Sequence, residues 1–93
     1  GFANTGTLTH GQVSLEGIRY LTLTYGRPSP LPMGANYRIE MSSDLLHWTT
    51  ADVVVVSDPV SDGWQTVTVR DRTPLDQGSP RFLRVHVEPA SPQ

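Results

Sequence analysis

Residues 19–25 read RYLTLTY, and their polar and apolar side chains alternate with a period of two. One face of an extended chain then carries the larger apolar residues, Leu21, Leu23 and Tyr25. The opposite face carries Tyr20, Thr22 and Thr24. This period is typical of a β-strand that buries one face, whereas an amphipathic helix repeats every 3.6 residues. The stretch therefore predicts a strand whose leucines face a core.

Similar segments occur along the rest of the chain. Alternation also marks residues 37–42, 64–70 and 82–88, and a weaker example over 7–15 is interrupted by Gly11. Within 37–42 the side chains expected to point outward are Arg38, Glu40 and Ser42. Residues 50–56 contain four consecutive valines, which indicate a strand buried on both faces or an edge strand covered by a loop.

Turn residues separate these segments. Residues 27–34 contain three prolines and are expected to be irregular, and further connections are expected at 58–63 and 73–80. Residues 43–48 (SDLLHW) are too short for an independent helix. They predict a tight connection in which Asp44 accepts backbone N–H groups, while Leu45 and Trp48 fold back onto the core.

Six short strands without a helical pattern predict an all-β protein, an antiparallel β-sandwich of six to seven strands. Its 93 residues suit a single domain over 1–93, with frayed ends at 1–6 and 89–93. The chain starts at Gly1 without a methionine, so we expect it to be a processed or excised piece of a larger protein.

Composition excludes several classes of function. The net charge is −2 with scattered charges, so no basic stripe favours nucleic acid. The absence of cysteine excludes disulfides, thiol catalysis and thiolate metal sites. No segment approaches the roughly 20 apolar residues of a membrane span.

Candidate metal and cofactor sites are weak, and we expect none. The histidines lie in separate segments without metal-ligand spacing: His10, His47 and His86. Asp58 and Asp62 in the loop at 58–63 make a calcium site an alternative interpretation of this loop. The loop lacks the alternating ligands of a dedicated calcium loop. Turn formation is the favoured interpretation of this loop.

Catalytic patterns are equally weak, so we expect a protein that is not an enzyme. Glu40 and Glu88 lie on outward strand faces near Arg38 and Arg84, which favours cross-strand ion pairs over a glycosidase carboxylate pair. No serine occupies a nucleophile elbow, and no glycine-rich phosphate loop precedes a helix.

Aromatic residues are the best candidates for ligand binding. Tyr37 and Trp48 are expected in the core, as a domain of this size needs them there. Trp64 begins a strand directly after an Asp-Gly turn, and Tyr20 shares its face with threonines. These two rings are the candidates for stacking against sugars.

The order of these residues also resembles known families. Residues 37–87 resemble the centre of a fibronectin type III domain, with Tyr37 leading to Trp48 and a TPLDQGSPRFLRVHV segment at 73–87. The corner tyrosine of that family falls at Phe82, which lacks the hydroxyl, and the family's last strand is not evident. This resemblance implies an immunoglobulin-like or fibronectin-like sandwich.

A closer resemblance covers residues 20–87. The pattern YRIEMSSDLLHW followed by RFLRV is similar to a C-terminal β module of large secreted proteins from environmental bacteria. The SSDLLHW part also resembles a blade turn of β-propeller glycoside hydrolases, a fold about three times longer than this chain. We interpret that likeness as shared hairpin chemistry.

The resemblance implies a non-catalytic accessory module, secreted or displayed at the cell surface. We expect it to act as a structural spacer or protein-contact domain against neighbouring domains of its parent protein. One alternative is a carbohydrate-binding module that holds polysaccharide through Trp64 and Tyr20. Another is a C-terminal sorting or surface-attachment domain that recognises cell-surface components.

Overall fold

The computed structural model describes residues 8–75 and 80–88 of the chain. The ends expected to fray, 1–6 and 89–93, and the loop residue Asp76 lie outside the described residues. The described part contains no helix of the length and apolar character that a membrane crossing requires. It contains eight strands: β1 (Leu8–Leu15), β2 (Ile18–Pro28), β3 (Asn36–Ser42), β4 (Thr49–Thr50), β5 (Val53–Ser57), β6 (Val60–Ser61), β7 (Trp64–Asp71) and β8 (Phe82–Glu88).

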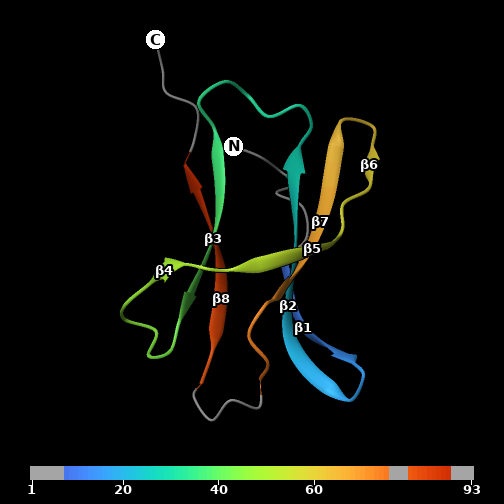
Figure 1. Ribbon diagram of the computed structural model, residues 1–93. Helices are drawn as coiled ribbons and strands as arrows, with labels where there is room; N and C mark the ends of the chain where they lie inside the picture. The colour runs from blue at the N-terminus through green and yellow to red at the C-terminus, as the bar shows by residue number, and fades with distance from the viewer. Residues whose placement is uncertain (1–7, 76–79, 89–93) are drawn as a thin grey trace.

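The strands form two antiparallel sheets, as predicted for a β-sandwich. One sheet, called sheet A here, has the order β1-β2-β7-β5, and β6 also pairs with β7. The other, sheet B, has the order β4-β3-β8. In Figure 1, β3 and β8 lie side by side, and β5 crosses from β4 towards β7. Both sheets contribute to the core, whose buried members are Leu23, Tyr25, Ile39, Val67, Val69 and Leu83.

The stretch that predicted the first strand lies in the middle of β2. Leu23 and Tyr25 face the core opposite Val69 and Val67 of β7. The Tyr25 ring stacks on Tyr37 of sheet B, with ring centroids 6.1 Å apart. Burial raises the pKa of the Tyr25 hydroxyl, so this group stays neutral at the interface of the sheets.

Strand boundaries differ from the prediction at three places. Residues 50–56 are two strands, because the chain leaves sheet B after β4 and joins sheet A as β5. The segment expected to be irregular begins later, since β2 continues to Pro28, which lies opposite Trp64. Gly11 does not interrupt β1, because it pairs with Thr22 in an unbroken register.

The valine run was expected to be buried or covered, and this was wrong. Val53 packs against the core, but Val55 and Val56 are 55% and 52% exposed. Among the described strands β5 pairs with β7 alone. Sheet B ends at β4, which has only two residues, so little of sheet B extends over Val55 and Val56. The register also shifts between Val55 and Ser57, as in a β-bulge.

Candidate functional site

Trp64 lies at the start of β7, on the outer face of sheet A. Its indole crosses Gly26 on the neighbouring strand: a Cβ atom at position 26 would come within 2.4 Å of the indole Nε1. Glycine therefore provides the space that the ring occupies. Trp64 is half-buried, with its ring laid against the sheet.

Tyr20 lies towards the other end of β2, also on the outer face of sheet A. The guanidinium carbon of Arg70 is 4.6 Å from the centroid of its ring. This is cation–π geometry, and it covers one face of the ring with a cation. Tyr20, the second ring predicted to stack against sugars, is therefore half-buried like Trp64.

Threonines occupy the sheet surface between the two rings. Thr24 and Thr68 face each other across β2 and β7, with their hydroxyl oxygens 2.9 Å apart. The register continues this row to Thr9 on β1 and Ser57 on β5. We call the outer surface of sheet A the threonine face; its hydroxyl residues on the two central strands are Thr22, Thr24, Thr66 and Thr68.

The structure therefore places Trp64 and Tyr20 on one face but not in one site. Gly26, beneath the Trp64 ring, is six residues from Tyr20 along β2, which corresponds to roughly 20 Å at about 3.3 Å per residue. A single sugar cannot contact both rings. An extended polymer lying along the strands can reach both.

The outward carboxylates form the cross-strand ion pairs that the sequence predicts. Arg84 Nε and Nη2 each lie 2.8 Å from Glu40 Oε1. This hydrogen bond lowers the pKa of Glu40, with the nearby cations adding to the effect. Glu88 lies 3.8 Å from Arg38 Nη1 and accepts a hydrogen bond from Asn36. The Arg84 guanidinium also lies 4.1 Å from the centroid of the Trp48 ring.

The histidines lie in three separate environments. His10 Nε2 donates to the backbone oxygen of Leu83 at 3.0 Å, and His47 Nδ1 donates to Asp44 Oδ2 at 2.7 Å. His86 lies on β8 opposite Arg38. Across 8–75 and 80–88, no three metal-ligating side chains gather into a group that would hold an ion.

The loop considered for calcium contains a β-hairpin turn. Asp62 and Gly63 join β6 to β7 with φ values of 52° and 77°. Two consecutive positive φ values are typical of a type I′ turn, which the Asp-Gly sequence favours. Glu16 and Gly17 make the same kind of turn between β1 and β2, with φ values of 52° and 82°. The residues of this second turn do not predict a hairpin, because glutamate is an uncommon residue at positive φ.

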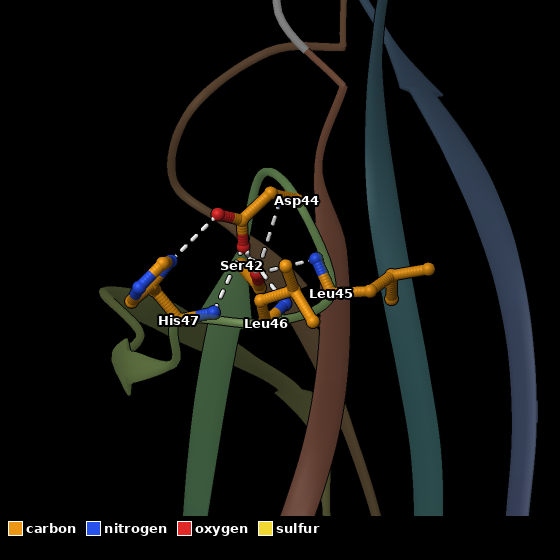
Figure 2. Close-up of polar contacts among 5 residues, drawn as sticks. All are labelled: Ser42, Asp44, Leu45, Leu46 and His47. Carbon is orange, nitrogen blue, oxygen red and sulfur yellow. Dashed lines mark hydrogen bonds and ion pairs between the residues drawn. The ribbon is translucent and has the colours of Figure 1, made fainter.

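Ser42 was expected to point outward, but only 1% of it is exposed. The turn that follows β3 folds over it, and its hydroxyl oxygen accepts the N–H groups of Asp44 and Leu45 at 3.1 and 2.8 Å (Figure 2). The hydroxyl also donates to Asp44 Oδ1 at 2.9 Å. These hydrogen bonds satisfy the Ser42 hydroxyl, so the turn can bury this polar side chain without leaving it unpaired.

Asp44 accepts backbone N–H groups, as predicted. Its Oδ1 receives the N–H groups of Leu46 and His47, both at 2.8 Å (Figure 2). The His47 side chain, these N–H groups and Ser42 hold the pKa of the Asp44 carboxyl well below its usual range. Leu45, expected to fold onto the core, is 55% exposed with a φ of 66°. The left-handed backbone at this residue sets the direction of its side chain.

Asp71, one residue beyond the strand predicted over 64–70, is a structural residue. It ends β7 and is 1% exposed, with both carboxylate oxygens bound by the guanidinium of Arg81. Its Oδ1 also accepts the Thr73 N–H at 3.1 Å. The signal was present in the alternation, since Asp71 follows Val67 and Val69 on the inward face of the strand.

Comparisons with known protein families, curated proteins and solved structures return no match.

Proposed function

We propose that this domain is a non-catalytic accessory module of a larger exported bacterial protein, and that it acts by contact with neighbouring domains. The exposed apolar edge of sheet A carries this proposal. Val55, Val56 and Val60 are each more than half exposed on strands whose outer edge has no partner among the described residues. Such edges favour pairing or packing with another chain, and monomeric proteins usually shield them.

The arrangement of the carboxylates supports the same proposal. Asp71 is held by Arg81, Glu40 by Arg84, and Asp44 by its own turn. Each carboxylate stabilises a junction between strands or a turn. None of these three has a second carboxylate among its hydrogen-bonding partners, so they support a structural interpretation over acid–base chemistry.

Strand order supports an immunoglobulin-like or fibronectin-like type, the kind of domain built into long exported proteins. The orders β1-β2-β7-β5 and β4-β3-β8 correspond to strands A-B-E-D and C′-C-F of such sandwiches. The seventh strand of that fold, G, has no counterpart among the residues described.

Calorimetry of the full-length protein tests the proposed contact. A contact module shifts the unfolding temperature of the domain beside it, and Val56→Lys on the exposed edge should remove that shift. Val56→Thr keeps the β-branched shape without the charge and is the matched control. If deletion of the module leaves its neighbour's unfolding unchanged, the contact function is wrong.

A second candidate, carbohydrate binding, is favoured by the shared placement of Trp64 and Tyr20. Hydroxyl groups between two rings suit an extended polysaccharide, which stacks on aromatic faces and exchanges hydrogen bonds along its length. Sedimentation with insoluble cellulose and chitin tests it. Trp48 lies next to β4 of sheet B, so Trp48→Ala is the matched control. Binding that is lost in Trp64→Ala but kept in Trp48→Ala would support a carbohydrate-binding face.

A further inference from the structure

Arg70 differs in its partners from most other arginines of the chain. Carboxylates hold four of them: Arg38, Arg72, Arg81 and Arg84. Within residues 8–75 and 80–88, Arg70 has no carboxylate partner, and its one hydrogen bond runs from Nη1 to the Asp71 carbonyl at 3.3 Å. A guanidinium has five N–H donors, so most of those on Arg70 remain available to a ligand.

Tyr20 holds the Arg70 side chain on the outer face of sheet A. Arg70 lies opposite Thr22, so Tyr20 is its diagonal neighbour on β2 and is within reach of a long side chain. The cation–π contact between them acts through the electrons of the ring and involves no anionic oxygen. Tyr20 therefore positions the guanidinium without neutralising its charge.

The described strands of sheet A contain a single acid, Asp71. Its side chain is 1% exposed and is bound by Arg81, so it contributes no negative charge to the outer face. Glu16 and Asp62 lie in the turns at the ends of the strands. Although the chain as a whole has a net charge of −2, the threonine face therefore carries a positive charge at Arg70.

A hydroxyl group lies beside this cation. Thr22 is opposite Arg70 on β2, and Gly11 is opposite Thr22 on β1. A Cβ atom at position 11 would lie 3.1 Å from Thr22 Oγ1, so glycine leaves space beside the hydroxyl. A hydroxyl next to a guanidinium suits a sugar that carries both hydroxyl groups and an anionic group, because each finds a hydrogen-bonding partner.

We infer that Arg70 binds the carboxylate or sulfate group of an acidic polysaccharide that lies along the threonine face from Tyr20 towards Trp64. Guanidinium N–H groups bind paired anionic oxygens, which both of these groups present. Thr22 exchanges a hydrogen bond with the same sugar, and Trp64 stacks on an uncharged part of the polymer. A nucleic acid has a charge on every phosphate and needs several cations, whereas this face offers one. The inference rests on carbohydrate binding, the second candidate function, and names the class of ligand.

The test uses three soluble polymers with the same glucan backbone: hydroxyethylcellulose, which is uncharged, carboxymethylcellulose and cellulose sulfate. Isothermal titration calorimetry with the 93-residue chain measures their affinities. At least one acidic polymer should bind tenfold more tightly than hydroxyethylcellulose, and the comparison of the two identifies the anion. Equal affinity for all three polymers would overturn the inference and leave carbohydrate binding intact, whereas binding of none would contradict both.

Arg70→Gln removes the cation and should abolish the preference for acidic polymers. Arg72→Gln is the matched control, because it changes the net charge equally, lies two residues away and loses an arginine already paired with Asp52. Equal losses in the two variants would mean that the attraction depends on net charge and not on Arg70. Tighter binding of an oligothymidylate than of either acidic polymer would assign the face to nucleic acid instead.

A second pair of variants keeps Arg70 and blocks it. Val54 lies opposite Arg70 on β5, so Val54→Glu places a carboxylate beside the guanidinium as a cross-strand ion pair. This variant should lose the preference for acidic polymers, and Val54→Gln, which has the same size without the charge, should keep it. Amide chemical shifts in the parent should change at Tyr20, Thr22 and Arg70. Shifts confined to sheet B, or an unchanged preference in Val54→Glu, would overturn the inference.

Discussion

Arg81 places its guanidinium on the buried carboxylate of Asp71 and so joins the start of β8 in sheet B to the end of β7 in sheet A. The Arg81 side chain is 17% exposed and that of Asp71 1%, so water screens the pair weakly. Removal of one partner leaves a buried charge without compensation, which costs about 3–5 kcal/mol in comparable pairs. The link is therefore one of the strongest polar contacts between the sheets.

Arg81→Ala should accordingly lower the free energy of unfolding by about 3 kcal/mol, as measured by urea denaturation. Arg72→Ala is the control, because the Arg72–Asp52 pair is 59% and 76% exposed and is expected to contribute about 0–1 kcal/mol. Similar losses in the two variants would mean that burial does not strengthen the Asp71–Arg81 pair.

Gly26→Ala tests the packing of Trp64 on sheet A. The added methyl group meets the indole, which must move, and overpacking of this kind typically costs about 1–3 kcal/mol. In a Trp64→Ala background the obstacle is absent, so the same change should be nearly neutral. Urea denaturation of the four proteins in this cycle, the parent, the two single variants and the double variant, measures the coupling. A cost that persists without Trp64 would place the obstacle elsewhere.

The sequence predicted those parts of the fold in which neighbouring residues determine orientation. Alternation in RYLTLTY located the buried side chains Leu23 and Tyr25, and the acid of SSDLLHW was correctly expected to bind backbone N–H groups. It did not predict the exposure of Val55, which depends on how far sheet B extends over a distant strand. Nor did it predict the burial of Ser42, which depends on the path of the turn that follows.

The same distinction holds for the candidate site. Trp64 and Tyr20 share a face because both follow the alternation of their strands, and the alternation was readable. The contact of Trp64 with Gly26 depends on the register between β2 and β7, two strands far apart in the sequence, and no local pattern determines that register. The contact of Arg70 with Tyr20 depends on the same register.

Leu45→Gly should stabilise the isolated domain. A leucine in the left-handed region costs about 1–2 kcal/mol, and glycine avoids most of this cost while losing more entropy on folding. We expect a net gain of about 0.5–1 kcal/mol in the free energy of unfolding. Leu46→Gly lies beside it with no positive φ and should instead be neutral or destabilising. A loss in Leu45→Gly would show that the exposed leucine side chain stabilises the fold by more than its backbone strain.

Lowering the pH should weaken the turn after β3 through Asp44. The pKa of this carboxyl is lower in the folded chain than the ordinary value near 3.8, so folding favours the ionised form. Its stabilising effect is complete above about pH 4 to 5, and it is lost as the pH falls through the lower folded pKa. Asp44→Asn should therefore be less stable than the parent at pH 6, and the difference should shrink steadily between pH 4 and pH 2. Urea denaturation of both proteins across this range measures the difference in the free energy of unfolding. The pKa of Glu40 is also lowered in the folded chain, but Glu40 is present in both proteins, so its contribution cancels in the difference. A difference that stayed constant with pH would mean that the carboxylate charge adds nothing to the hydrogen bonds of the turn.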